Sequence, residues 1–178
     1  MAFNAKDRVG KYNVSPVADR IWADIIFDSK FEMAVAQALV MALPVSTKIH
    51  LQTKFTLLPT QTGVDSRGKE KVLYKTRGYK ADFVIRDSSD PEQYMVLDAK
   101  GMVLDTFSLK AALFYWVWKR EITLVKSSVK NLSLLDWARY GLKPNIEVFT
   151  NPKLRREMLP KLTTEEIRSR FVLSINQQ

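Results

Sequence analysis

The alternation of apolar and polar positions in the first third of the chain predicts a helix followed by a strand. Residues 29–43, SKFEMAVAQALVMAL, are rich in helix-favouring residues and hold no Gly or Pro before Pro44, which predicts a helix. Residues 48–58, KIHLQTKFTLL, alternate as a strand does, with the odd-numbered residues from Ile49 to Leu57 on one face. The only histidine, His50, is then expected on the outward face or at the rim.

The middle of the chain predicts more strands joined by short turns. Residues 59–68, PTQTGVDSRG, are polar and contain glycine, so they predict a hairpin loop. The predicted elements that follow are strands over 71–77 and 79–86 on either side of Gly78, a turn over 87–93, and a strand over 94–100.

The second half adds helices on both sides of a further strand. The predicted elements are a helix over 107–120 capped by Asp105, a strand over 122–126, a helix over 131–140 ended by Gly141, a strand over 146–150, and a helix from Thr163 with a Thr163–Glu166 capping box. This order predicts an α/β fold with a mixed central sheet flanked by helices. The expected domain plan is an N-terminal arm (1–27), a core domain (28–150) and a basic C-terminal extension (151–178).

The composition narrows the class of protein. The 178 residues are 46% hydrophobic, as in a folded globular protein. The absence of cysteine excludes disulfides and thiolate zinc sites, and a single histidine excludes metal sites built from several histidines. No apolar run approaches the about 20 residues that cross a bilayer, and the N-terminus lacks a secretory signal pattern. We therefore expect no membrane partner and a cytoplasmic location, in the host cell if a phage encodes the protein.

The formal charge of +9 favours a polyanionic partner such as nucleic acid, although many basic proteins bind none. The candidate phosphate contacts are Lys54, Lys80, Lys110, Lys119 and Arg120.

Candidate chemistry lies at the end of the strand YMVLDAK. Asp98 and Lys100 lie two residues apart, so they point to the same side of that strand. The preceding strand carries Asp82, and pairing of the two strands across the short turn would bring the carboxylates together. Oxygen ligands favour Mg²⁺, for which Mn²⁺ can substitute, and Lys100 could orient a water or stabilise a charged phosphate.

Asp82 followed by Asp98-Ala99-Lys100 on the next strand resembles the motif of the PD-(D/E)XK nuclease superfamily. The resemblance implies a restriction-endonuclease-like core, with Glu32 of the first helix completing a metal site formed by Glu32, Asp82 and Asp98. The chain looks most like small phage-encoded endonucleases, including Holliday junction resolvases of the endonuclease I type, over about residues 27–126. This resemblance implies Mg²⁺-dependent hydrolysis of DNA that leaves a 5′-phosphate, and a homodimer if the substrate is branched DNA. It also implies that Lys110, on the helix after the motif, is a second basic residue that contacts phosphate.

The sequence departs from the motif at Ala81, where the superfamily's eponymous proline would stand. A D-x-K triplet also arises by chance, and the chain holds a second one at Asp28-Ser29-Lys30. Three simpler interpretations stay open: Glu32 as part of a capping box with Ser29, Asp98–Lys100 as an edge ion pair, and Asp82 as a solvent-facing residue. The alternative functions are a linear duplex nuclease of restriction or packaging type and a non-catalytic DNA-binding module.

Overall fold

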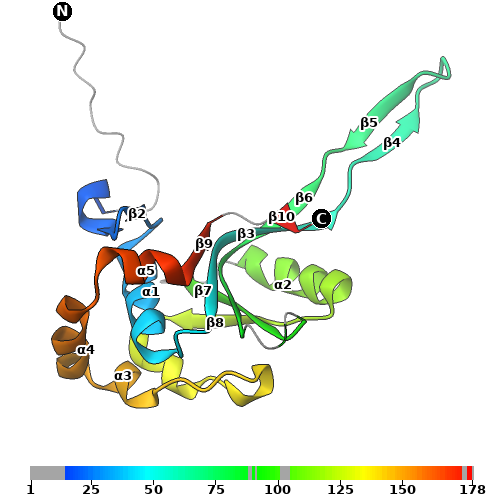
Figure 1. The fold of residues 1–178 in the computed structure, drawn as a ribbon. Coiled ribbons are helices and arrows are strands. Elements are labelled where there is room, and N and C mark those ends of the chain that lie inside the picture. Colours follow the sequence, from blue (N-terminus) through cyan, green and yellow to red (C-terminus); the bar gives the residue numbers. More distant parts are fainter. Residues whose placement is uncertain (1–14, 88–89, 91, 101–104, 174–175, 178) are drawn as a thin grey trace, which may run out of the picture.

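The computed structural model describes residues 15–87, 90, 92–100, 105–173 and 176–177, and its centre is a six-stranded mixed sheet (Figure 1). The strands β3 and β6 are antiparallel, as are β6 and β7, whereas β8 runs parallel to β7, and β9 and β10 run parallel to β3. The predicted mixed central sheet is confirmed. The sheet strands are β3 (Lys48–Leu58), β6 (Arg77–Arg86), β7 (Tyr94–Lys100), β8 (Ile122–Lys126), β9 (Phe171–Leu173) and β10 (Asn176–Gln177).

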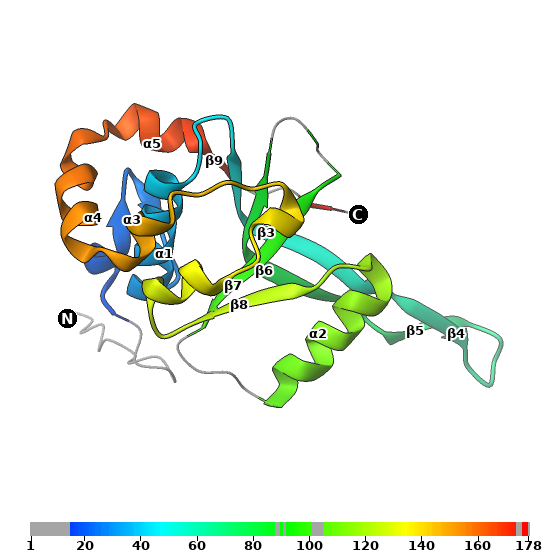
Figure 2. The ribbon, with the colours of Figure 1, turned by 90° about the horizontal axis from the view of Figure 1, so that it is seen from below.

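Helices cover both faces of the sheet, as the sequence predicted (Figure 2). One face packs against a hydrophobic core that includes Val35 and Leu39 of the first helix and Phe149, and the other packs against Phe114. In the described part of the chain, no helix is long and apolar enough to span a membrane. The helices on the first face are α1 (Lys30–Ala42), α3 (Ile146–Thr150), α4 (Pro152–Met158) and α5 (Thr164–Arg170), and α2 (Asp105–Trp118) lies on the second.

Two elements of the second half differ from the prediction. The continuous helix predicted over 131–140 is wrong: two 3₁₀ helices, η2 (Val129–Leu134) and η3 (Ala138–Tyr140), take its place, and Gly141 ends the second at φ 66°. Leu132 and Trp137 are both buried in the first core. In a continuous α-helix, residues five apart would point about 140° away from each other, so a single helix would not bury both side chains in the same core. The strand predicted over 146–150 is also wrong, because Asn145 caps this segment by accepting a hydrogen bond from the N–H of Glu147 and starts α3.

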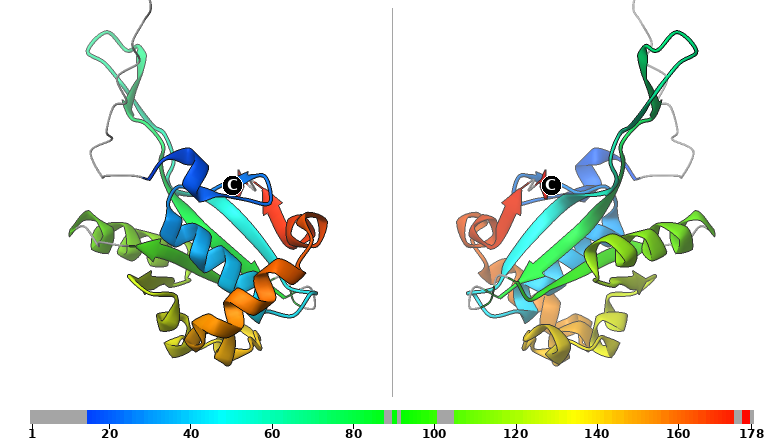
Figure 3. Two further views of the ribbon diagram at one scale, coloured as in Figure 1. Left: turned by 90° about the vertical axis from the view of Figure 1, so that its left-hand side faces the viewer. Right: turned by 90° about the vertical axis from the view of Figure 1, so that its right-hand side faces the viewer.

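The loop predicted over 59–68 is shorter than expected. Strands β4 (Gln61–Val64) and β5 (Glu70–Tyr74) form a separate two-stranded antiparallel sheet, hereafter the ribbon, which projects from the body of the protein (Figures 1 and 3). The turn at its tip uses Gly68 at φ 76°, a left-handed conformation that favours glycine. The strand predicted over 71–77 corresponds to β5 and ends at Tyr74.

Strand β3 does not keep one face toward one core, contrary to the prediction. Ile49 and Leu51 pack in the first core, whereas Phe55 and Leu57 pack in the second. The change occurs at Gln52, whose φ of 54° is left-handed and breaks the regular alternation of side chains. His50 is also buried rather than outward-facing, and burial together with the nearby Arg86 lowers its pKa to about 4. The imidazole is therefore neutral at physiological pH.

The two terminal segments contribute to the body of the fold. Residues 17–20 form the 3₁₀ helix η1 (Val17–Arg20), and β1 (Ile21–Trp22) pairs with β2 (Ile25–Ile26) before Phe27 enters the first core. The first fourteen residues of the predicted arm lie outside the described residues. At the other end, residues predicted as a basic extension form α4, the 3₁₀ helix η4 (Leu159–Lys161) and α5, and continue into β9 and β10 beside β3. The Thr163–Glu166 capping box at the start of α5 is confirmed.

Arg170 joins the C-terminal segment to the end of α1. Its buried guanidinium donates hydrogen bonds to the carbonyls of Val40, Leu43, Pro44 and Thr47 at 2.6–3.3 Å. These carbonyls lie at and beyond the C-terminus of α1, where helix carbonyls lack intrahelical partners and where a cation interacts favourably with the helix dipole.

We predict that Arg170→Met lowers the free energy of unfolding by about 2–4 kcal/mol, because several buried carbonyls lose a charged donor. Urea denaturation would measure this loss. The neighbouring Arg168, whose side chain is 58% exposed and pairs with Asp24, supplies the matched control, and Arg168→Met should change stability little. Equal effects of the two substitutions would contradict the assigned role of Arg170.

Candidate active site

The antiparallel pairing of β6 and β7 brings Asp82 and Asp98 together. Phe83 pairs with Leu97, so the same register continued by one residue places the two aspartates opposite each other. Phe83, Val84 and Ile85 of β6 and the residues of β7 before Asp98 are apolar and buried, which fixes the register of the two strands. Asp98 lies near the end of β7, and Asp82 lies in the middle of β6. The predicted proximity of the two carboxylates is therefore present in the structure, although part of the predicted turn at 87–93 lies outside the described residues.

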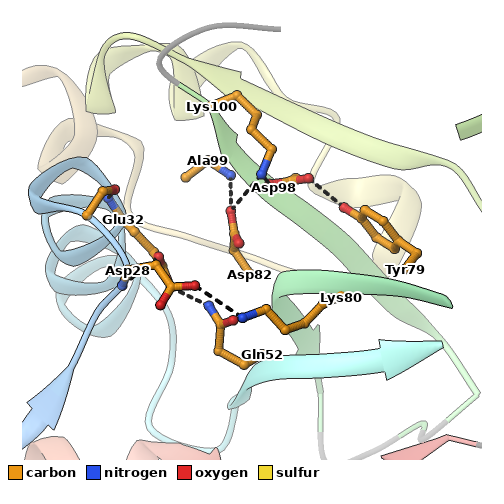
Figure 4. Close-up of polar contacts among 10 residues, drawn as sticks. Asp28, Glu32, Gln52, Tyr79, Lys80, Asp82, Asp98, Ala99 and Lys100 are labelled. Atoms are coloured by element: carbon orange, nitrogen blue, oxygen red, sulfur yellow. Dashed lines mark hydrogen bonds and ion pairs between the residues drawn. The ribbon is translucent and has the colours of Figure 1, made fainter. Parts of the chain in front are cut away.

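Lys100 closes the group from the same side of β7 (Figure 4). Its Nζ lies 2.6 Å from Oδ1 of Asp98 and 3.8 Å from Oδ2 of Asp82. The Tyr79 hydroxyl donates a hydrogen bond to Oδ2 of Asp98 at 2.7 Å, and the backbone N–H of Ala99 donates to Oδ2 of Asp82 at 2.8 Å. One ammonium, one hydroxyl and one amide therefore hold the two carboxylates in place.

Burial decides the electrostatics of this group. Asp98 is 0% exposed and Asp82 7% exposed, so Asp82 is not a solvent-facing residue and the Asp98–Lys100 contact is not a surface ion pair. Burial, followed by the hydrogen bond and negative charge of Asp98, raises the pKa of Asp82 well above its usual range. Burial would lower the pKa of Lys100, but the Asp82 and Asp98 carboxylates outweigh it and raise that pKa, so the ammonium is charged at neutral pH.

Glu32 lies beside this group at the start of α1. It is 3% exposed, and burial, followed by the charge of Asp28, raises its pKa. Its carboxylate accepts hydrogen bonds from the Asp28 N–H at 3.1 Å and from Gln52 Nε2 at 2.7 Å. Ser29 caps the helix by accepting a hydrogen bond from the Glu32 N–H, so the helix-start interpretation is confirmed for Ser29, while the Glu32 carboxylate contacts Asp28 instead of completing the box.

The direct three-carboxylate metal site expected from the sequence is not formed by the described residues. Among them, no three His, Cys, Asp or Glu side chains lie close enough together to hold a metal ion. Asp82 and Asp98 form the close pair, and Glu32 is near enough to raise the pKa of Asp82 and of Lys100 by its charge. A role for Glu32 through an intervening water stays a prediction.

The paired aspartates suit a hard divalent cation. Mg²⁺ is commonly held by one or two carboxylates, several waters and the phosphates of its substrate, so two carboxylates suffice. Within the described residues, the buried Oδ1 of Asp98 accepts no hydrogen bond besides its contact with the Lys100 ammonium. Two carboxylates that repel each other in a buried place favour either a shared proton or a cation, and the donor set therefore fits Mg²⁺ or Mn²⁺.

Sequence reasoning missed two residues of the site, Gln52 and Tyr79. Gln52 lies between two paired positions of β3 and β6, Leu51–Phe83 and Thr53–Ala81, and is therefore opposite Asp82. Its left-handed φ of 54° costs a non-glycine residue about 1–3 kcal/mol, and such outliers cluster at functional sites. No local sequence signal marks Gln52, because the conformation follows from packing of both strands. No local spacing marks Tyr79 either, because residues three apart on a strand point to opposite faces and its partner, Asp98, lies on the next strand.

We predict that Gln52→Gly separates stability from function. Glycine removes the strain of the left-handed φ, which offsets the lost hydrogen bond to Glu32, so the free energy of unfolding should stay within about 1 kcal/mol of wild type. The loss of the Gln52 amide should nevertheless lower the activity of the site about tenfold or more, since the Glu32 carboxylate loses a partner that positions it. Urea denaturation and the DNA cleavage assay described below measure the two effects, and an unchanged activity would contradict the positioning role.

The five predicted phosphate contacts lie in three different settings. Lys54 and Lys80 pair directly across β3 and β6, and Lys80 Nζ lies 3.1 Å from Oδ2 of Asp28 beside the site (Figure 4). Lys110 is exposed on α2, and Lys119 lies 4.7 Å from the ring centre of Trp116. Arg120 donates to the carbonyl of Glu92 at 2.9 Å and lies over the ring of Tyr94, which gives it a structural role.

Fold and site together define a mixed α/β protein with a buried Asp–Asp–Lys group where two neighbouring strands of its central sheet meet. The chain belongs to the DUF1064 family, described as a protein of unknown function, whose sequence profile matches residues 10–133. No curated protein matches the chain. No solved structure matches it either.

Proposed function

We propose that this protein is a DNA endonuclease that depends on Mg²⁺, with Mn²⁺ as a substitute. The observation that carries the proposal is the convergence of Asp82, Asp98 and Lys100, which places the Lys100 ammonium 2.6 Å from the Asp98 carboxylate and 3.8 Å from the Asp82 carboxylate, both of them buried. Acids on adjacent strands beside a helix that carries a further glutamate are also what a restriction-endonuclease-like core requires, and we extend the proposal to that fold.

The proposed roles follow from the contacts of each side chain. Asp82 and Asp98 would hold the metal ion, which when bound supplies charge stabilisation on a phosphate oxygen and a lowered pKa of a bound water. Tyr79 fixes the orientation of Asp98 through its hydrogen bond. Lys100 is protonated, so it donates hydrogen bonds and stabilises negative charge at the phosphate and does not act as a base. Glu32, held by Gln52, orients water from the side of α1.

DNA is the proposed substrate because the protein carries a formal charge of +9 and presents Lys54 and Lys80 near the site. Branched DNA is the first choice among DNA structures, and it is supported by the resemblance to phage-encoded resolvases. A homodimer would place two such sites for symmetric cuts in the two strands. Lys110 on α2 and Lys119, which follows the end of α2, are then additional phosphate contacts.

Cleavage of labelled DNA tests the proposal. Purified protein is incubated with a four-way junction, a linear duplex and a single strand at one fixed salt concentration, with Mg²⁺ or with EDTA. We expect Mg²⁺-dependent cleavage that favours the junction and leaves 5′-phosphate ends. Cleavage of the linear duplex at an equal or higher rate would instead support a nuclease of restriction or packaging type. Tight DNA binding without any product would support a non-catalytic DNA-binding module.

A further inference from the structure

The ribbon projects from the body of the protein and is exposed along most of its length. Every residue of β5 is exposed, and within the described residues β4 and β5 pair only with each other. Figures 1 and 3 show that it leaves the body as a continuation of β3 and β6, the strands that carry Gln52 and Asp82. A two-stranded sheet with so little support from the core is costly to form unless something binds it.

The ribbon is nevertheless well ordered at both ends. At its tip, Oδ1 of Asp65 accepts hydrogen bonds from the N–H groups of Arg67 and Lys69 at 2.8 and 3.0 Å. At its base, the hydroxyls of Thr60 and Thr76 are 2.8 Å apart and hydrogen-bonded. The ribbon is therefore a defined element and not an open loop, and the acid at its tip is engaged by the turn itself.

Residues 61–74, which span the ribbon and its turn, carry three cations and two acids, and Lys75 and Arg77 at its base add two more cations. Residues 59–77 therefore carry five cations and two acids, a net charge of +3. Lys71 and Leu73 are two residues apart on β5 and therefore lie on one face of the strand, whereas Val72 lies on the other. Leu73 packs over Gly63 of β4, which pairs with Lys71. The remaining cations flank the strand: Arg67 and Lys69 at the tip, and Lys75 and Arg77 at the base.

The base of the ribbon holds a hollow of about 280 Å³. Its walls include Tyr74, Lys75 and Arg77, an aromatic ring beside two cations. This combination suits the stacking of a nucleobase or sugar on the ring while the cations contact adjoining phosphates. Arg77 also begins β6, and Lys80 and Asp82 follow on that strand, so the cations of the ribbon lead toward the candidate active site.

We propose that the ribbon lies in the major groove of the DNA duplex next to the cleaved bond and sets the position of that duplex on the active site. This inference rests on the proposed function, because it takes DNA as the substrate. The major groove of B-DNA is about 12 Å wide and admits a two-stranded β-ribbon, whose strands are about 4.8 Å apart. The cations Arg67, Lys69 and Lys71 contact phosphates along the groove, and the exposed Val64 and Val72 contact the methyl groups of thymine.

The test compares two variants of equal charge by fluorescence anisotropy with a labelled 30-base-pair duplex in EDTA, where no cleavage occurs. The ribbon variant carries Arg67→Gln, Lys69→Gln and Lys71→Gln, and the control variant carries Lys130→Gln, Lys143→Gln and Lys161→Gln, which are all exposed positions elsewhere. We expect the ribbon variant to bind at least about tenfold more weakly near 0.1 M salt and to lose about 0.9 from the salt-dependence slope for each phosphate contact removed. The control variant should bind as the wild type does.

Each other outcome has a definite meaning. Equal binding by the ribbon variant and wild type, or an equal loss in both variants, overturns the inference. A wild-type dimer that the substitutions Val72→Thr and Tyr74→Ser dissociate, with DNA affinity unchanged in the monomer, also overturns it, because the ribbon would then join two copies of the chain. If DNA binding depends on the ribbon but no cleavage occurs in Mg²⁺, the proposed nuclease activity is rejected and the ribbon inference stands. If cleavage occurs and the ribbon substitutions do not affect it, the nuclease activity stands and the ribbon inference is rejected.

Discussion

Asp98→Asn and Lys100→Met each lower the rate constant for DNA cleavage in Mg²⁺ by at least about 10²–10³-fold, the usual cost of removing one electrostatic partner of a reacting group. Asp98→Asn should slow cleavage because asparagine removes the negative charge that binds a cation. It keeps the shape of the side chain and can still accept the hydrogen bond from Tyr79. Lys100→Met keeps an unbranched side chain of similar length and removes the ammonium 2.6 Å from Asp98. Single-turnover cleavage of a labelled junction measures the rate constant without interference from product release.

A surface ion pair in the same chain provides the matched control. Lys30 Nζ and Oδ2 of Asp19 are 2.7 Å apart, but both side chains are about half exposed. Asp19→Asn and Lys30→Met therefore make the same chemical changes outside the site, and we expect the cleavage rate to stay within about twofold of wild type, since exposed pairs contribute little. Full activity in Asp98→Asn or Lys100→Met would reject the site.

Asp82→Asn stabilises the metal-free protein and removes its response to Mg²⁺. We expect the melting temperature in EDTA at pH 8 to rise by roughly 3–6 °C, because asparagine is neutral without a proton, whereas the buried Asp82 carboxyl must hold a proton that the unfolded chain has released. For a chain of this size, 1 kcal/mol corresponds to about 2–4 °C. Asparagine keeps an oxygen that can accept the hydrogen bond from the Ala99 N–H. Mg²⁺ should raise the melting temperature of wild type, because a ligand that binds only the folded state stabilises it, and leave Asp82→Asn unchanged.

The stability of the metal-free wild type should fall as the pH rises. The folded-state pKa of Asp82 lies above its ordinary value, so the folded protein holds a proton that the unfolded chain releases above about pH 4. The stabilisation from this proton is complete below the unfolded pKa and is lost as pH rises through the folded pKa. Glu32 acts in the same direction. Wild type in EDTA should therefore lose stability between pH 5 and pH 9, and the gain from Asp82→Asn should grow over that range.

Differential scanning fluorimetry at several pH values, with EDTA and with Mg²⁺, measures both effects. Asp19→Asn is again the control, because its exposed carboxylate should change neither the melting temperature in EDTA nor the shift with Mg²⁺. A destabilised Asp82→Asn protein at pH 8, or an equal Mg²⁺ shift in this variant and wild type, would show that the carboxylate pair does not carry the proposed electrostatics.

The sequence by itself determined the features that depend on local spacing. The helix α1 follows from its composition and its Ser29 cap, and the common side of Asp98 and Lys100 follows from the two-residue period of a strand. The approach of Asp82 to Asp98 also follows locally, because two strands joined by a short turn pair as an antiparallel hairpin. Such features need few long-range contacts, so a pattern of residues is enough to predict them.

Only the tertiary structure decided the rest. The left-handed Gln52, the parallel pairing of β9 with β3, and Arg170 at the end of α1 each join residues far apart in the chain. In residues 146–150, the apolar residues suit a strand, but the capping hydrogen bond that the Glu147 N–H donates to Asn145, together with burial of Phe149, selected a helix. Local preferences amount to a few tenths of a kcal/mol per residue, whereas burying one large side chain contributes about 1.5–3 kcal/mol, so packing prevails wherever the two disagree.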